Sequence, residues 1–442
     1  MRKIAIIGGG FTGLSAAYDL AQAGWEVELF ESESKLGGLA GVFEISPGIF
    51  LEKFYHHWFT NDVNILSLVE ELGIGHHLSP KPTNTGLYFA NSIFRLASPL
   101  DLLKFTPISF ISRVRTGLMA LLARRINDFK ALENISASEW IKKIAGEESY
   151  RVVWRPLLEG KFGPEADNIS AVWFWNKLKL RGASRGKSGK EELFYINGGF
   201  KVLLDRLEQR LRELKVNINL NTSVNEVQQQ SEQVIVKLSD TTQLTKSFDA
   251  VLVTTPIPTY AKLMTDLSAQ DRDKLQQIRF LGNICLVLVL DKSLSETYWL
   301  NIADPNFPFV GIIEHTNFDS KENYGGNHIV YLSKYLPTSD PRYGFTTEGL
   351  FEYSLPYIQK MFPNFSREQV INKFSWKEPY SQPVITKHYS KIIPPVKTPF
   401  SRIFLSTMAQ VYPEDRGTSY AVRGGREAAK MINEVVEEVK GN

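Results

Sequence analysis

The first thirty residues follow two hydrophobic patterns in turn. Residues 4–7 form a short apolar run typical of a buried strand, and residues 14–23 carry apolar side chains at helical spacing. Gly24 ends that helix, and residues 25–30 alternate as a second strand that Glu31 closes. The pattern predicts one complete βαβ unit.

Similar patterns return further along the chain. Residues 61–75 predict a helix that Gly73 ends. Residues 194–227 predict a helix followed by a strand that ends near Thr222, and residues 247–264 begin with another strand. A strand, a loop and a helix are expected over residues 400–439, and strand-rich segments fill much of the region before them.

Length and composition then narrow the class of protein. A chain of 442 residues is too long for one ordinary core and is expected to build two domains. Charged residues make up 22% and the net charge is +3 with both signs mixed, which gives no indication of a nucleic-acid partner. The single cysteine, Cys285, lies in an apolar run and is expected to be a buried, inert thiol. No apolar run reaches the roughly 18 residues of a spanning helix, so we expect a cytoplasmic protein.

The glycines after the first strand point to a bound dinucleotide. Gly8, Gly10 and Gly13 have the spacing that turns the chain tightly, brings backbone against a pyrophosphate and packs the helix onto the strand. The amino end of that helix supplies free N–H groups to the phosphates. Glu31, at the end of the second strand, is placed to accept hydrogen bonds from the hydroxyls of an adenosine ribose. A purely structural glycine turn is the alternative, but strand, glycines, helix, strand and acid all follow in order.

A second glycine cluster indicates which dinucleotide, NAD or FAD, is bound. Gly37, Gly38 and Gly41 follow just beyond Glu31, where a nicotinamide-dependent enzyme has no need of them. The stretch ESESKLGGLAG resembles the flavin-binding signature of the superfamily of amine oxidases, protoporphyrinogen oxidases and phytoene desaturases. The resemblance implies FAD, held non-covalently, with this loop beneath its pyrophosphate and ribityl chain. Leu39 stands where many members have an arginine.

The resemblance extends to the segments expected to complete the cofactor site. The strand about Val224 resembles the one that receives the adenine, and residues 254–256 resemble a segment that covers the dinucleotide again. The C-terminal stretch resembles a subgroup of protoporphyrinogen-oxidase-like NAD(P)/FAD-dependent oxidoreductases, but it has Ser406 and Thr407 where the superfamily has Gly-Asp. Whether Thr407, Glu414 or Asp415 replaces that aspartate stays open. The predicted cofactor-binding residues are Gly8, Gly10, Phe11, Thr12, Gly13, Glu31, Ser32, Lys35, Gly37, Gly38, Leu39, Val224, Thr254, Pro256, Thr407, Arg416, Gly417, Thr418 and Tyr420.

The predicted fold class is α/β. We expect a Rossmann-like FAD-binding domain into which an α+β substrate domain, a mixed sheet plus helices, is inserted. The FAD-binding domain is assigned to residues 1–75, 191–265 and 396–442, and the substrate domain to residues 76–190 and 266–395.

Two adjacent histidines and three aromatic residues are the candidates for the chemistry. His56 and His57 lie where superfamily members run a strand past the flavin; on a strand they face opposite sides, and His57 is preferred because it lies nearer Trp58. Tyr195, Trp376 and Tyr380 resemble positions close to the flavin or the substrate, and ordinary core packing is their alternative reading. Metal-ligand spacing is absent from the sequence, so no metal is predicted.

The expected substrate domain offers two further features. Arg155, in the apolar context VVWRPLLEG, is predicted to bind a carboxylate or phosphate of the substrate. Residues 102–125 combine a broad apolar face with Arg113, Arg115, Arg124 and Arg125. They could touch a membrane peripherally, as relatives acting on porphyrin or isoprenoid substrates do, but a helix buried against the core explains the same pattern and is favoured.

The resemblance implies an FAD-dependent oxidoreductase. Such an enzyme oxidises a small organic substrate, at an amine, porphyrin-like or isoprenoid-like C–H or C–N centre, by hydride transfer to flavin N5. An acceptor such as oxygen or a quinone then takes the electrons. Two alternatives stay open: a redox-neutral sugar-nucleotide mutase resembling UDP-galactopyranose mutase, and a non-catalytic scaffold resembling GDP-dissociation inhibitors.

Overall fold

A parallel five-stranded sheet joins segments from both ends and the middle of the chain. The computed structural model describes residues 2–96, 98–183, 192–239, 244–304 and 306–438. The strand order is β10-β2-β1-β14-β20, and every neighbouring pair is parallel. The strands are β1 (Lys3–Ile7), β2 (Glu26–Phe30), β10 (Asn217–Asn219), β14 (Ala250–Val253) and β20 (Ile403–Leu405).

Both faces of this sheet are covered, which explains its nearly continuous apolar strands. Ile4 and Ile6 pack in one core with helices α1 (Phe11–Gln22) and α13 (Thr418–Glu438). Ala5 and Ile7 face the other way, into a core with an antiparallel sheet. That second sheet is formed by β11 (Val224–Gln230), β12 (Gln233–Leu238) and β13 (Thr245–Phe248). Helix α1 begins three residues earlier than the apolar spacing alone predicts, because Gly10 is its N-cap.

A seven-stranded mixed sheet forms the core of the other half of the molecule. Its order is β19-β15-β18-β17-β16-β7-β8, antiparallel except for the pair β16 and β7. Helix α12 (Thr347–Met361) packs on it through Phe351 and Ile358. The strands are β7 (Thr85–Phe89), β8 (Ser92–Arg95), β15 (Phe280–Leu290), β16 (Trp299–Ile302), β17 (Gly311–Glu314), β18 (His328–Leu336) and β19 (Val370–Pro383). Cys285 is buried in β15, and this burial raises the pKa of its thiol, as expected of an inert cysteine.

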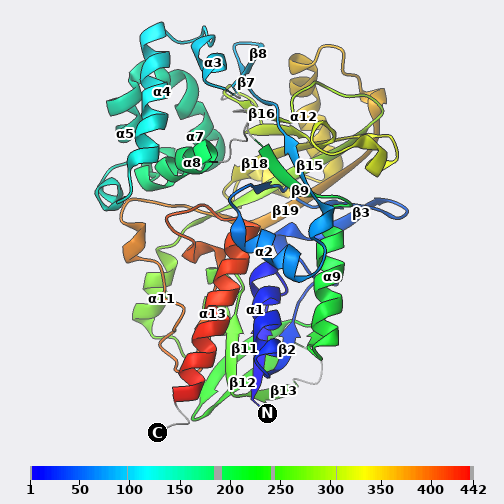
Figure 1. Cartoon of the computed structure of the whole chain (residues 1–442), viewed down its shortest axis with the longest axis vertical. Helices are drawn as coiled ribbons and strands as arrows, with labels where there is room; N and C mark the ends of the chain where they lie inside the picture. The colour runs from blue at the N-terminus through cyan, green and yellow to red at the C-terminus, as the bar shows by residue number, and fades with distance from the viewer. Residues whose placement is uncertain (1, 97, 184–191, 240–243, 305, 439–442) are drawn as a thin grey trace.

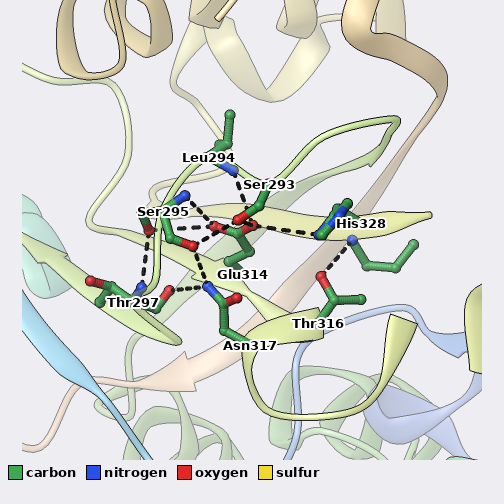
Figure 2. A network of polar contacts seen from close by, with 9 residues as sticks. Ser293, Leu294, Ser295, Thr297, Glu314, Thr316, Asn317 and His328 are labelled. Carbon is green, nitrogen blue, oxygen red and sulfur yellow. Dashed lines mark hydrogen bonds and ion pairs between the residues drawn. The ribbon is translucent and has the colours of Figure 1, made fainter. Parts of the chain in front are cut away.

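A buried carboxylate fixes the turn that leads into β16 (Figure 2). Glu314, at the end of β17, accepts hydrogen bonds from the hydroxyl of Ser293 at 2.6 Å and from the backbone N–H groups of Leu294 at 3.0 Å and Ser295 at 2.9 Å. Asn317 donates to the carbonyl groups of Ser295 and Thr297. The turn before β16 is therefore held by side chains from the end of β17 and the residues that follow it.

Helices of the inserted segments form a layer beside this sheet, at the end of the molecule opposite the two termini (Figure 1). They are α3 (Pro99–Leu103), α4 (Phe110–Arg125), α5 (Ala137–Ala145), α6 (Glu147–Ser149), α7 (Arg155–Phe162) and α8 (Ala171–Ala183). Contrary to the favoured expectation for residues 102–125, α4 buries only one of its large apolar residues, Met119, against the core. Its buried residues are Ser112, Thr116, Met119 and Ala123, and its other large apolar side chains are exposed.

The remaining elements connect the two halves. A small sheet, β5-β9-β6, pairs strands from either side of the predicted domain boundaries near residues 75 and 190. The connecting elements are β3 (Val42–Ser46), β4 (Ile49–Glu52), β5 (Trp58–Phe59), β6 (Leu78–Pro82), β9 (Glu192–Ile196), α2 (Val63–Glu71), α9 (Phe200–Glu213), α10 (Ile257–Leu263) and α11 (Ala269–Gln276). The α/β fold class is confirmed, with its nucleotide-type sheet and separate mixed sheet; the domain boundaries stay a prediction.

The contact between α1 and α13 gives the first testable prediction. A Cβ atom at Gly425 would lie 2.3 Å from the backbone oxygen of Thr12, so the two helices would have to separate. We expect Gly425→Ala to lower the free energy of unfolding by about 1–3 kcal/mol, measured by urea denaturation.

Gly117→Ala is the matched control, because Gly117 is also inside a helix but a Cβ there would meet only Leu102, at 3.7 Å. That variant should be neutral or stabilising by up to about 1 kcal/mol, since alanine favours helix over glycine. Equal effects of the two substitutions would contradict a specific helix contact at Gly425.

Candidate active site

A cavity of about 690 Å³ lies where the carboxyl ends of β1, β2 and β14 meet the start of α13 and the strand β19. Ligands of open α/β sheets bind at this edge, and this volume is within the usual range of ligand pockets. Of the residues predicted from the sequence, the wall includes Gly8, Gly10, Phe11, Glu31, Ser32, Gly37, Gly38, Leu39, His56, Val224, Thr254, Pro256, Trp376, Tyr380, Thr407, Arg416, Gly417 and Thr418.

The turn between β1 and α1 leaves no room for side chains. A Cβ at Gly8 would lie 2.6 Å from the hydroxyl oxygen of Thr254, and one at Gly13 would lie 2.0 Å from the carbonyl oxygen of Gly8. Within the described residues, no side chain caps the amino end of α1, where Gly10 and Phe11 face the cavity. The first N–H groups of this helix therefore point toward the space that an anionic group would fill.

Glu31 connects the first glycine turn to the end of β2. Its carboxylate is buried and accepts hydrogen bonds from the backbone N–H groups of Gly9 at 2.7 Å and Glu33 at 2.9 Å. The hydroxyl of Ser32 also donates to Glu31, at 3.2 Å. An ionised carboxylate has about four acceptor sites, so capacity is left for a further donor inside the cavity, such as a ribose hydroxyl.

The second glycine loop lies directly against the first. The N–H of Gly37 donates to the carbonyl of Gly9 at 2.9 Å, and Gly10 and Gly37 form an isolated bridge. Leu39 lines the cavity, whereas the ammonium group of Lys35 lies 5.6 Å from the ring centre of Phe50 and is not on the wall. Thr12, Gly13 and Tyr420 also lie off the described wall, although Thr12 and Gly13 are in the first turn of α1.

The amino end of α13 forms a second helix terminus at the cavity. Gly417 and Thr418 line it, and the hydroxyl of Thr418 accepts a hydrogen bond from the indole of Trp58 at 2.7 Å. The guanidinium of Arg416 donates to Gln382 at 3.1 Å and to the hydroxyl of Tyr335 at 2.7 Å, which holds its charge at the wall.

Three residues, Thr407, Glu414 and Asp415, are the candidates to replace the superfamily aspartate. Among the three candidates, only Thr407 lines the cavity. Glu414 pairs with Arg423 at 3.0 Å, and Asp415 pairs with Lys161 at 3.0 Å and Lys177 at 2.6 Å. Burial raises the pKa of Asp415, but the two lysines and the neighbouring arginine outweigh burial and hold the pKa well below its usual range.

Strand β19 lines the cavity with the alternate residues Trp376, Glu378 and Tyr380, and also with Lys377. Glu378 was missed from the sequence, although the two-residue period of a strand through Trp376 and Tyr380 includes it. Burial raises the pKa of Glu378. Lys53, also missed, lines the same region, with its ammonium group 4.8 Å from the ring centre of Trp376.

His56, and not the preferred His57, lies at the cavity wall. The two residues lie in a bend between β4 and β5 and not on a strand. The Nδ1 of His56 donates to the carbonyl of Phe54 at 2.6 Å, which leaves Nε2 as the acceptor. The Nδ1 of His57 lies 2.9 Å from the hydroxyl of Tyr298, away from the wall.

Tyr195 and Arg155 are not brought to the cavity. The hydroxyl of Tyr195 is fully buried and donates to the carboxylate of Glu52, 2.9 Å from Oε2, and Glu52 also accepts the N–H of Phe200 at the start of α9. Arg155 has a side chain that is 56% exposed and pairs with Glu159 at 2.8 Å. Its apolar neighbours in sequence, Val152, Val153 and Leu158, pack inward, and the role of Arg155 as a substrate ligand stays a prediction.

The described residues contain no group of three or more His, Cys, Asp or Glu side chains that could hold a metal ion.

Solved structures and curated proteins are similar to this chain. The fold is shared with an oxidoreductase from Methanosarcina mazei, with a TM-score of 0.75 at 17% identity over 97% of this chain and 100% of that one. A coproporphyrinogen III oxidase from Staphylococcus aureus is 24% identical over 58% of this chain and 60% of the relative. A zeta-carotene desaturase from Synechocystis sp. is 29% identical over 38% of this chain and 39% of the relative. The chain thus spans between 39% and 60% of the length of these curated relatives.

The family follows from a match to almost the whole chain. The family described as flavin containing amine oxidoreductase matches residues 11–433, and the chain belongs to it. Membership implies FAD as the cofactor. The uncapped end of α1, the paired glycine loops and Glu31 fit that group at the cavity.

One buried and one half-buried histidine predict how stability depends on pH. Burial lowers the pKa of His315 to about 4 and that of His56 to about 4. The unfolded chain therefore binds protons first as the pH falls below about 6.5, so the free energy of unfolding should decline from there toward pH 4. His315 should contribute up to roughly 1.4 kcal/mol per pH unit and the half-buried His56 less.

The measurement is urea denaturation at a series of pH values. His315→Gln keeps a donor toward the hydroxyl of Tyr324, which lies 2.7 Å from Nε2, and should flatten the decline. His56→Asn should flatten it less, and the same replacement at exposed His76 serves as the control. An unchanged slope in His315→Gln would show that His315 does not titrate in this way.

Proposed function

We propose that this protein binds FAD non-covalently and uses it to oxidise a small organic substrate. The observation that carries the proposal is the uncapped amino end of α1 facing the cavity between two interlocked glycine loops. When bound, FAD supplies a hydride acceptor at N5 and passes the electrons to an acceptor such as oxygen or a quinone. Membership of the family supports the same activity.

In this proposal, different residues of the cavity bind different parts of FAD. The turn of Gly8, Gly10 and Gly13 with α1 binds the pyrophosphate, and Glu31 binds the adenosine ribose. Val224, where β11 begins, lines the cavity and would contact the adenine, and Thr254 and Pro256 form a further part of the wall. At the other end, Gly417 and Thr418 direct the amino end of α13 at the flavin ring, where a positive dipole stabilises added negative charge. Thr407 replaces the missing aspartate beside the ribityl chain.

The substrate lies along β19 in this proposal. Trp376 and Tyr380 form an aromatic wall that orients a flat or apolar substrate and excludes water. His56 accepts the released proton through Nε2, because its Nδ1 is committed to the carbonyl of Phe54. An amine, a porphyrin-like or an isoprenoid-like substrate fits this wall. His57 and Tyr195 support the wall from behind through Tyr298 and Glu52.

We also propose a cytoplasmic protein that touches a membrane peripherally through residues 102–125. None of the helices in the described part of the chain is long and apolar enough to cross a bilayer. The outward apolar face of α4 supports contact with the surface of a membrane.

The visible spectrum of the purified protein tests the redox proposal. Bands near ~375 and ~450 nm that bleach with dithionite would establish a redox-active flavin, and its release by acid precipitation would show non-covalent binding. A colourless protein that also fails to take up added FAD would contradict the proposal and favour a binding scaffold. Turnover that needs a prior reductant, with no net oxidation, would favour the mutase alternative.

Glu31 provides a prediction for cofactor affinity. Glu31→Gln removes the charge that orients the ribose and weakens the hydrogen bond from the N–H of Gly9. The Kd for FAD should therefore rise roughly tenfold. Titration of the apoprotein with FAD, followed by flavin fluorescence, measures it.

Glu33→Gln is the matched control, because Glu33 also lines the cavity but its carboxylate is exposed. A similar loss of affinity in both variants would point to a general effect of charge and not to a ribose contact at Glu31.

A further inference from the structure

Large apolar side chains gather on one exposed surface of the inserted helices. Among the described residues, twelve large apolar side chains are exposed, and nine of them lie between residues 93 and 122. Phe110 is 64% and Ile111 is 71% exposed. A soluble surface rarely concentrates such residues without a partner that covers them. We call this surface, formed by β8, α3 and α4, the apolar face; its main members are Leu100, Leu103, Phe110, Ile111, Leu118 and Leu121.

The orientation of α4 is fixed by its inner contacts. The hydroxyl of Thr116 is buried and lies 2.8 Å from that of Ser149, and the hydroxyl of Ser112 donates to Glu148 at 2.5 Å. Apart from the buried Met119, small and polar side chains thus face the protein and large apolar ones face outward, the reverse of an ordinary surface helix. Rotation of α4 to bury Phe110 and Ile111 would break these hydrogen bonds.

Positive charge surrounds the apolar face. Residues 98–126 contain five basic side chains, Lys104, Arg113, Arg115, Arg124 and Arg125, and a single acid, Asp101. Asp101 is already paired with Arg95 at 3.6 Å. The guanidinium groups of Arg113 and Arg115 donate to backbone carbonyls, which fixes their position and leaves their charge without a neutralising acid in those contacts.

We propose that the apolar face docks on a lipid bilayer that carries anionic headgroups. Phe110, Ile111 and Leu118 enter the boundary between headgroups and acyl chains, and the arginines bind lipid phosphates. This inference rests on the proposed peripheral membrane contact, to which it adds the lipid chemistry and the elements β8 and α3. It is independent of the redox activity.

The position of the apolar face sets the orientation of the bound protein. Helices α3 and α4 lie at the end of the molecule opposite α1, α13 and both termini (Figure 1). Docking therefore turns the helical layer of α4, α5 and α8 toward the bilayer and directs the five-stranded sheet away from it.

Co-sedimentation of the full-length holoprotein with vesicles tests the proposal. Binding should be strong to mixed phosphatidylcholine and phosphatidylglycerol, weaker to phosphatidylcholine alone, and reduced by salt. Phe110→Ser combined with Ile111→Ser should weaken binding at least tenfold, because both side chains are already exposed and the fold does not depend on them. Arg124→Gln combined with Arg125→Gln should remove most of the preference for the anionic lipid.

Matched variants elsewhere on the surface distinguish binding through the apolar face from non-specific binding to vesicles. Val63→Ser combined with Ile371→Ser removes apolar side chains that are 65% and 56% exposed but lie outside the apolar face, and should leave binding unchanged. Arg212→Gln combined with Lys430→Gln is the control for charge. Absence of vesicle binding by the unsubstituted protein, or equal losses in the controls, would overturn the proposal.

A second copy of the chain is the other occupant that the experiment can reveal. A dimer in sedimentation velocity that Phe110→Ser and Ile111→Ser abolish, together with no vesicle binding, would overturn lipid docking. The flavin spectrum of every variant is recorded in parallel. A normal spectrum with failed docking leaves the oxidoreductase proposal intact, so the two proposals fail separately.

Discussion

The close approach of two glycine turns is the contact on which the rest of the site depends. The turn after β1 and the loop after β2 meet backbone to backbone, with the N–H of Gly37 donating to the carbonyl of Gly9. Glu31 fixes the same place from a third direction by accepting the N–H of Gly9. Because no side chain separates the two turns, the amino end of α1 stays open toward the cavity, and the wall on this side consists largely of backbone donors.

Positive charge is concentrated around the same cavity. Helices α1 and α13 both direct their amino ends at it, and Arg416 adds a full charge held by Gln382 and Tyr335. Asp415, next in sequence to Arg416, would oppose this field if it were unpaired. Lys161 on α7 and Lys177 on α8 neutralise it, and in doing so they tie the inserted helices to the segment that begins α13. Loss of either lysine from a buried pair would be costly, because the remaining charge is hard to solvate.

The sequence was most informative where local patterns carry the geometry. The glycine spacing, the acid at the end of β2 and the apolar strands predicted the β1-α1-β2 unit, and the resemblance to a flavoprotein superfamily predicted many of the other residues that line the cavity. It was least informative where a side chain's direction depends on distant elements. Arg155 lies in an apolar stretch yet points to solvent, and His56 reaches the cavity although His57 was preferred, because a bend replaces the expected strand. The amphipathic pattern of residues 102–125 could not show which face packs inward, since that depends on Ser149 and Glu148 of another helix.

The strand order of the five-stranded sheet also bears on how the protein is made. Strand β1 pairs with β2 soon after both are synthesised, but its other neighbour is β14, at residues 250–253, and β14 in turn pairs with β20, at residues 403–405. A growing chain on the ribosome thus carries an unpaired apolar edge of β1 until more than half of its length has emerged. Such edges attract other strands, so the growing chain exposes an aggregation-prone edge throughout this interval. The cofactor pocket is completed last, when the segment that begins α13 arrives.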